Sequence, residues 1–420
     1  MKWGRYEALD LAEVVHADEV MPTAFMHLFF DGRINVPQLV QALDKVVAVV
    51  PEIICRADIT HHLFEPLPLS AVDLITETDH LVSAGPLINP MSGPQIGILV
   101  GHGCDSDSIG LAFSHVLADG QAVQMFLGLL ADYYNGLAPD VTNNRSIAAY
   151  LSKVRVGPAT PAEEAANRMP GSALLPSRPG DQPYCPRVVV PGQVMAGLKA
   201  RARRQRMTLN DVFLAGYVRV LCRLQDVTEI AVPCPADLRR VLGAEGLTVA
   251  NMTTGFLLGA TVNPGDTFND TVAQVHAEMS LMRERNRCAA SLQRLHRWWR
   301  MLPPRWTAEI VRRSYSILPV AYTNLGVIDE TKFRFGQTTA TWGTVTGTYR
   351  AGGCFLMSVT TIGTVTTLAC ALLGDETLAQ EGEKVLHLVS HECEAWLDEP
   401  ETQPSPAGSS ATVEASSGER

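Results

Sequence analysis

The chain has 420 residues, 46% of them hydrophobic and 19% charged, and its formal net charge is −10 at pH 7. This balance is typical of a globular protein with two domains or two lobes and an ample core. The acidic charge argues against nucleic-acid binding through a basic surface. No apolar stretch approaches the roughly 18 residues of a membrane-spanning helix, so no membrane span is expected. The N-terminus lacks the apolar core of a signal peptide.

The nine cysteines are an odd number and form no C-x-x-C pair. Most lie in apolar settings, which is typical of buried free thiols in a reducing cytoplasm. We therefore expect a cytoplasmic protein without a disulfide framework, a cysteine nucleophile or a zinc site. No redox cofactor is implied.

The first third of the chain alternates strand and helix patterns in chain order. The expected elements are strands over residues 24–30, 53–57 and 109–114, and helices from 36 to the proline at 51 and over 121–134. Asp31-Gly32 closes the first strand, and Asn135-Gly136 stops the last of these helices.

Between residues 109–114 and 121–134 lies Ser114-His115-Val116-Leu117-Ala118-Asp119-Gly120. The His115 imidazole is therefore expected at the end of a strand, where a rigid scaffold can orient it toward a substrate. Imidazole titrates near working pH, so it suits a general base. Taken alone, an isolated histidine is more often structural.

A segment rich in proline and glycine, residues 156–186, separates the two halves and is expected to hold no long regular helix. In the second half we expect strands over 187–190, 230–235, 338–349 and 355–373, a strand opened by 250–256, and helices over 192–206, 212–224 and 376–397. Thr208 to Asp211 supply the N-terminal cap of the helix over 212–224.

The pattern His115-x-x-x-Asp119-Gly120 resembles the active-site motif of the chloramphenicol acetyltransferase-like superfamily, which includes peptide-synthetase condensation domains and polyketide-associated acyltransferases. Residues 31–32, Asp237-Leu238-Arg239 and Ala250 to Phe256 are similar to family segments in the same order. Thr323-Asn324-Leu325-Gly326 looks like the family's Ser-Asn-Leu-Gly segment, with threonine for serine.

The resemblance implies an α/β fold of two chloramphenicol acetyltransferase-like lobes in a V, with a tunnel between them. We accordingly predict an N-terminal lobe over 1–155, a linker or crossing segment over 156–186, a C-terminal lobe over 187–398 and a disordered tail over 399–420. The tail is polar and cannot bury enough apolar surface to fold.

The resemblance also implies residue roles. His115 matches the general base, and Asp119 matches a structural aspartate that ties the loop to an arginine. Arg239 is the expected partner of that aspartate, with the adjacent Arg240 as the alternative. Gly120 is expected to permit a tight turn. Ser114 stands where the family motif often has a first histidine.

The oxyanion of a tetrahedral intermediate needs a hydrogen-bond donor. The first candidates are Thr323 and Asn324, and the second are Ser358 and Thr360, with Ser114 as a further candidate for substrate contact. Each of these polar residues could instead satisfy backbone groups at the lobe interface.

Two basic clusters have alternative interpretations. Residues 199–206 could bind coenzyme A phosphates or an acidic carrier protein, although such a run is more often a solvated helix face. Residues 294–304 mix arginine with tryptophan and could contact a membrane or an acyl chain, although such tryptophans usually pack between lobes.

The leading hypothesis is an acyltransferase that moves an acyl group from a coenzyme A or carrier-protein thioester to an alcohol or amine, in natural-product or lipid biosynthesis. The thioester is then a co-substrate, and no bound cofactor or metal is expected. The alternatives are a non-catalytic condensation-like recruitment module and a condensation-fold enzyme repurposed for cyclisation or another non-acyl reaction. A monomer is expected because one chain supplies both lobes.

Overall fold

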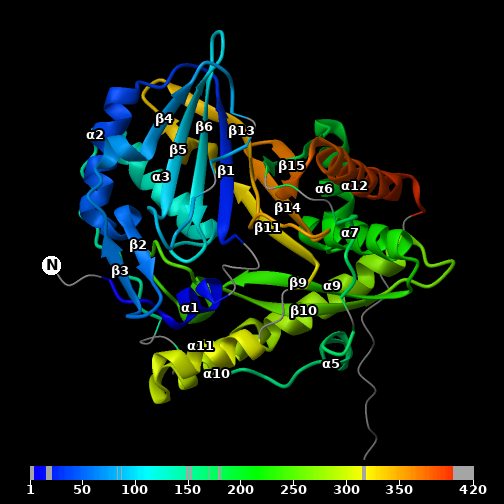
Figure 1. Ribbon diagram of the computed structural model, residues 1–420. Helices are drawn as coiled ribbons and strands as arrows, with labels where there is room; N and C mark the ends of the chain where they lie inside the picture. Colours follow the sequence, from blue (N-terminus) through cyan, green and yellow to red (C-terminus); the bar gives the residue numbers. More distant parts are fainter. Residues whose placement is uncertain are drawn as a thin grey trace, which may run out of the picture.

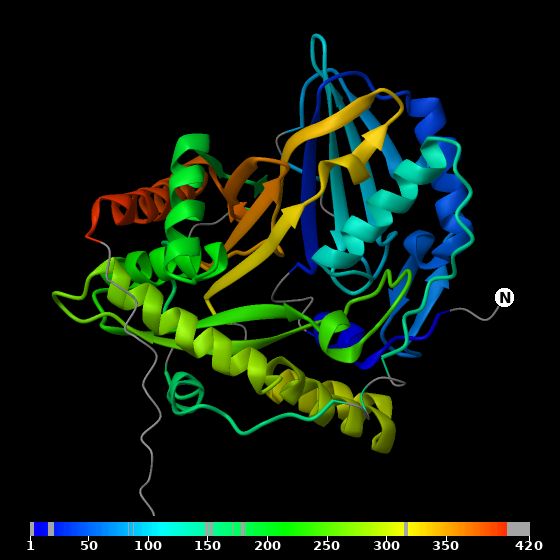
Figure 2. The same ribbon diagram turned by 180° about the vertical axis from the view of Figure 1, so that it is seen from behind.

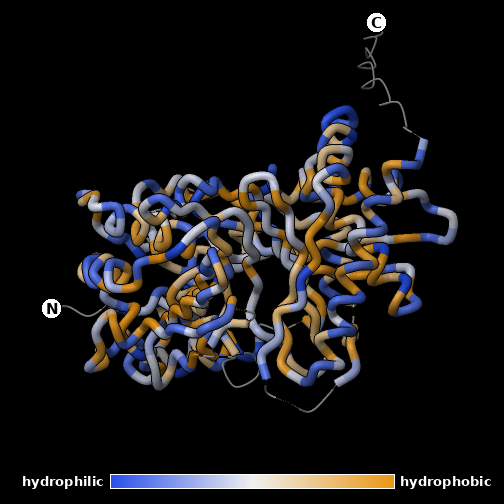
Figure 3. Tube along the Cα trace, turned by 90° about the horizontal axis from the view of Figure 1, so that it is seen from above, coloured by the Kyte–Doolittle hydropathy of each residue, from blue (hydrophilic) through white to orange (hydrophobic). Residues whose placement is uncertain are grey.

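The computed structural model describes residues 4–15, 21–82, 84–86, 88–147, 151, 154–169, 171–177, 180, 182–314 and 318–400. These residues form two α/β lobes that lie side by side (Figures 1 and 2). Figure 3 shows that hydrophilic and hydrophobic residues alternate along much of the chain trace.

The N-terminal lobe is built on a six-stranded sheet of order β12-β13-β1-β6-β5-β4. Its strands are β1 (Thr23–Phe30), β4 (Ile75–Thr78), β5 (Ile96–His102), β6 (Asp107–Ser114), β12 (Arg334–Phe335) and β13 (Thr338–Val345). A separate hairpin comprises β2 (Cys55–Asp58) and β3 (Leu63–Pro66), and the helices are α2 (Val36–Val49) and α3 (Gly120–Tyr134). Every residue of β1 and β6 is buried, which places these two adjacent strands at the centre of the lobe.

The C-terminal lobe contains a four-stranded sheet of order β11-β14-β15-β8 and two separate strand pairs, β9 with β10 and β7 with β16. Its strands are β7 (Gln182–Tyr184), β8 (Arg187–Val190), β9 (Glu229–Asp237), β10 (Thr253–Thr261), β11 (Val320–Ile328), β14 (Phe355–Ile362), β15 (Val365–Ala369) and β16 (Leu372–Gly374). Its helices are α5 (Pro161–Ala166), α6 (Gly192–Arg204), α7 (Leu209–Gln225), α8 (Leu238–Leu242), α9 (Phe268–Glu284), α10 (Ala290–Met301), α11 (Pro304–Ser314) and α12 (Glu376–Ala395).

The two lobes share chain segments, so the predicted boundary at residue 155 and the assignment of all of 187–398 to the C-terminal lobe are wrong in part. Strand β13 pairs with β1 in antiparallel register, Met26 opposite Val345, and so belongs to the N-terminal sheet. Conversely, Ile147 and Val154 pack in the C-terminal core. Local residue patterns indicate a strand but not its partner. This exchange of segments between the lobes therefore could not be predicted from the sequence.

Helix α1 (Ala8–Val14) lies where the two lobes meet (Figure 1). Its residues Leu9 and Leu11 pack in the C-terminal core, whereas Val14 packs in the N-terminal core. It also contacts α10 and α11. The sequence analysis did not predict this helix or α9, and α1 proves important for the site.

The other predicted elements differ from the structure mainly at their ends. The strand expected over 355–373 is three strands: the chain turns between β14 and β15 at Gly363, where φ is +57°, and β16 leaves this sheet to pair with β7. Of the predicted tail, Glu399 is ordered and caps α9 by accepting hydrogen bonds from the backbone N–H groups of Phe268 and Asn269. Residues 401–420 lie outside the described residues. Among the described helices, none combines the length and hydropathy that a membrane crossing requires.

Candidate active site

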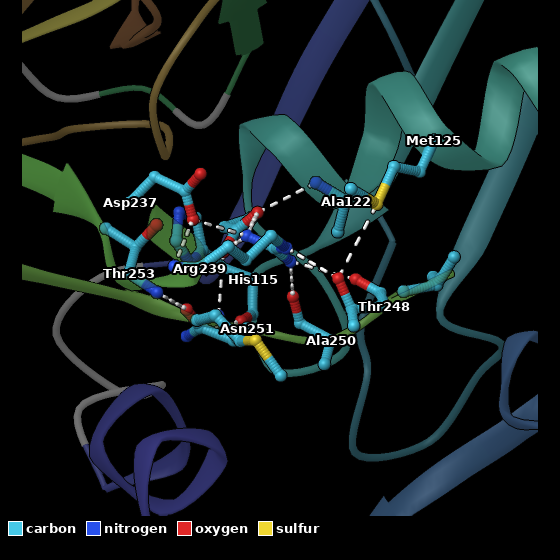
Figure 4. A network of polar contacts seen from close by, with 12 residues as sticks. His115, Ala122, Met125, Asp237, Arg239, Thr248, Ala250, Asn251 and Thr253 are labelled. Atoms are coloured by element: carbon cyan, nitrogen blue, oxygen red, sulfur yellow. Dashed lines mark hydrogen bonds and ion pairs between the residues drawn. The ribbon is translucent and has the colours of Figure 1, made fainter. Parts of the chain in front are cut away.

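His115 follows the last residue of β6 and is held there through its backbone. Its N–H donates to the carbonyl of Pro22 at 2.7 Å, and its carbonyl accepts from the Asn251 side chain at 3.1 Å (Figure 4). Pro22 precedes β1 and Asn251 precedes β10, so segments from both halves of the chain fix the position of the histidine. The imidazole remains 20% exposed, which leaves room for a ligand to reach it.

The Asp119 carboxylate holds the loop that carries His115 through several hydrogen bonds. It caps α3 by accepting from the N–H of Ala122 at 2.8 Å, and it accepts from the N–H of Met252 at 2.7 Å. Its two oxygens also accept from Arg239 at 2.9 and 3.1 Å. These bonds occupy both carboxylate oxygens, so Asp119 is not the group that orients the imidazole.

Arg239 connects this carboxylate to the C-terminal lobe (Figure 4). Its Nη1 also donates to Asp237, its Nε to the Thr248 hydroxyl, and its Nη2 to the carbonyls of Thr248 and Ala250. All five guanidinium N–H groups therefore have acceptors. Burial lowers the pKa of Arg239, but the ion pairs with Asp119 and Asp237 outweigh this and raise it overall. Arg240, the alternative partner of Asp119, is exposed.

Gly120 is required for a different reason from the one the sequence suggested. Its φ is not among the positive values of the chain, so the turn itself does not demand glycine. A Cβ at this position would lie 2.6 Å from a methyl carbon of Leu325. The glycine therefore allows β11, which carries Thr323 and Asn324, to approach the His115 segment closely.

A Gly120→Val substitution is expected to destabilise the protein by about 1–3 kcal/mol, because the added side chain overpacks the contact with Leu325. Urea unfolding measures this cost. The double variant Gly120→Val/Leu325→Ala should recover part of it, since the displaced side chain is removed. Equal losses in the single and double variants would contradict this explanation of the glycine.

Thr323 and Asn324 line a pocket between β9, β10 and β11. The Asn324 side chain donates to the Tyr322 hydroxyl at 3.1 Å and accepts from the N–H of Gly326 at 2.8 Å. Cys234 also lines this pocket, and burial raises the pKa of its thiol, so it is not activated as a nucleophile. Thr323 and Asn324 thus stay candidates for substrate contact.

The other three hydroxyl candidates are engaged with the backbone. Ser114 is buried, and its hydroxyl accepts from the N–H of Val116 in the turn that follows β6. Ser358 and Thr360 are also buried and bond to backbone groups of Ala369 and Val345. These three residues satisfy backbone groups, which is the alternative that the sequence left open.

The two basic clusters have partly structural roles. Arg201 is buried, donates to the carbonyls of Leu397 and Glu399 and lies over the ring of Trp396. Trp299 stacks on His62 at 4.8 Å and packs against both cores, so it joins the lobes.

A larger pocket, of about 680 Å³, lies between β8 and α12 and contains none of the predicted site residues. Among the residues that the structure describes, no group of three or more His, Cys, Asp or Glu side chains is arranged as a metal site. Of the nine cysteines, seven are buried, and all nine are free.

Two residues near His115 were missed as site residues. Glu13 on α1 places a carboxylate oxygen 3.7 Å from Nδ1 of His115, and Asn251 holds the backbone of the histidine. Asn251 lies in the segment 250–256 that resembles the family, so that segment could have indicated it. Glu13 lies more than a hundred residues from the motif, and no local pattern distinguishes it.

The comparisons with known proteins concern the fold. No family model matches the sequence, and no curated protein matches it. Solved structures do match along almost the whole chain. The first condensation domain of the calcium-dependent antibiotic synthetase, in complex with a substrate analogue, aligns with a TM-score of 0.66, 14% identity and coverage of 95% of this chain and 97% of that one.

Two further structures are similar. Polyketide synthase associated protein 5 from Mycobacterium tuberculosis aligns with a TM-score of 0.65 and 16% identity over 94% of this chain and 98% of its own. The cyclization-docking bidomain of EpoB from Sorangium cellulosum aligns with a TM-score of 0.65 and 13% identity over 94% and 85%. The chain therefore has the fold of condensation domains, which confirms the predicted fold class.

Proposed function

We propose that this protein is an acyltransferase that moves an acyl group from a coenzyme A or carrier-protein thioester to an alcohol or amine, with His115 as the general base. The observation that carries the proposal is the placement of His115. Its backbone is fixed from both halves of the chain, and its side chain stays partly exposed. The close packing of Leu325 on Gly120 brings β11, which carries Thr323 and Asn324, toward the His115 segment.

The proposed reaction needs one proton transfer in each direction. His115 takes the proton of the acceptor hydroxyl or amine while the acceptor oxygen or nitrogen attacks the thioester carbonyl carbon. When the C–S bond of the tetrahedral intermediate breaks, the same proton passes from the imidazole to the departing sulfur. The products are an ester or amide and a free thiol, so no oxidant or further reactant is consumed.

Of the two candidates, we infer that Thr323 donates to the intermediate's oxyanion. Both polar groups of Asn324 are already bonded to Tyr322 and Gly326, and Thr323 is a lining residue of the same pocket. Removal of one oxyanion donor typically costs about 2.7–4 kcal/mol of barrier. We therefore assign this contact to Thr323 and a supporting role to Asn324.

The alternatives receive less support from the geometry. A recruitment module needs no partly exposed imidazole held by fixed backbone contacts. Cyclisation was suggested by serine at the position of the family's first histidine, but Ser114 is buried and its hydroxyl accepts a hydrogen bond from the N–H of Val116 in the turn. The similarity to a cyclization-docking bidomain does not favour that chemistry, since one fold can support many different reactions.

The function is tested with acetyl-, octanoyl- and palmitoyl-coenzyme A, and with the same acyl groups on a carrier protein, each offered to a panel of alcohols and amines. We expect thiol release together with an acceptor whose intact mass has grown by one acyl group. A protein that releases thiol from none of these donors with any acceptor, although folded, would rule the acyltransferase out.

A further inference from the structure

The nitrogen of His115 that faces α1 has an unusual environment. Nδ1 is buried, and it has no hydrogen-bond partner among the residues that the structure describes. The nearest carboxylate oxygen, Oε1 of Glu13, lies 3.7 Å away. The Glu13 side chain is 30% exposed, so its charge is only partly screened by water. A buried ring nitrogen next to a carboxylate favours a proton on that nitrogen.

The other carboxylates described near the histidine already form ion pairs with arginines. Asp119 and Asp237 both bind Arg239, which comes from α8. Asp10, on the same helix as Glu13, binds Arg145 at 2.8 Å. Among the residues that the structure describes, Glu13 is therefore the carboxylate that lies beside the imidazole without one of these arginine partners.

From this geometry we propose that Glu13 is a positioning residue for His115, an inference that rests on the proposed acyltransferase function. The carboxylate holds the proton on Nδ1, which leaves Nε2 unprotonated and able to accept a proton from the acceptor. It also stabilises the imidazolium that forms when that proton arrives. Glu13 acts through His115 and takes no part in bond making.

The separation of 3.7 Å is longer than a hydrogen bond but within the range of an ion pair. Contacts of this kind are often long in the free enzyme and shorten when the substrate binds. Helix α1, which carries Glu13, packs against both cores.

The first test needs no substrate. The protein is labelled with ¹⁵N-histidine, and the His115 signals are assigned with the His115→Ala variant. In the wild type we expect neutral His115 to carry its proton on Nδ1, and in Glu13→Ala a mixture of both tautomers. The titration midpoint should fall in Glu13→Gln, because the negative charge that favours the imidazolium is gone. An unchanged tautomer and midpoint in both variants would overturn the inference.

The second test is kinetic. Glu13→Ala should lower kcat by about 10-fold or more with little change in KM, because the lost contact is strongest in the transition state. In Glu13→Gln, which keeps an acceptor for the Nδ1 proton, the loss should be smaller. The acidic limb of its pH profile should still move to lower pH. Glu284→Gln, at an exposed position on α9, makes the same charge change outside the site and should leave rate and profile unaltered.

The outcomes separate this inference from the proposed function. If thiol release requires His115 but its rate and pH profile do not change when Glu13 is replaced, the acyltransferase function stands and the positioning role is wrong. If Glu13→Gln raises only the KM of the acceptor and leaves the pH profile unchanged, the carboxylate contacts the acceptor, which also contradicts the positioning role. If His115→Ala retains full activity, the proposed function itself fails.

Discussion

The His115→Ala variant is expected to transfer acyl groups about 10²- to 10⁴-fold more slowly than the wild type, since it lacks the group that takes the acceptor proton. Its melting temperature should stay close to the wild-type value. The imidazole is partly exposed, and the contacts that fix this position are made by the backbone of residue 115. The rate of thiol release from the best donor of the panel measures the effect.

A matched control for this variant is His387→Ala. His387 lies on α12 with 64% of its side chain exposed, outside the candidate site. It should retain wild-type rate and stability. Wild-type turnover by a correctly folded His115→Ala protein would show that the base is another group.

The Asp119→Ala variant is expected to lose about 3–5 kcal/mol of unfolding free energy, because it leaves Arg239 buried without its main counter-charge. It also removes the cap of α3 and the acceptor for the N–H of Met252. Chemical denaturation measures the loss, and activity should fall with it because the same contacts support the His115 loop.

The partner of Asp119 provides an internal check. In the double variant Asp119→Ala/Arg239→Met, the buried charge is gone, so the combined loss should be smaller than the sum of the two single losses. Arg240→Ala, beside it but exposed, should have little effect. Wild-type stability and activity in Asp119→Ala would contradict the structural role of the ion pair.

Much of the fold could be predicted from the sequence because its elements have strong local signals. The strand over 187–190 matches β8, and the helix capped at Thr208 is α7, with a capping box formed by Thr208 and Asp211. The segment containing His115 does lie between a buried strand and a helix, as its pattern indicated.

Long-range relations could not be predicted in the same way. The pairing of β13 with β1 joins residues about 300 positions apart, and the residue pattern of neither strand identifies its partner. Ser358 and Thr360 looked like site residues because they lie on a polar strand, but tertiary packing turns their hydroxyls toward backbone groups. Glu13 reaches His115 only because α1 packs between the two cores.

The most direct test of the central claim is chemical rescue of His115→Gly. The rate of acyl transfer by this variant is measured with increasing concentrations of imidazole, using the donor and acceptor that the wild type turns over. Since the missing group is a base, we predict that added imidazole restores part of the rate in the variant and leaves the wild type unchanged. Wild-type turnover by His115→Gly without any imidazole would contradict the assignment of His115 as the general base.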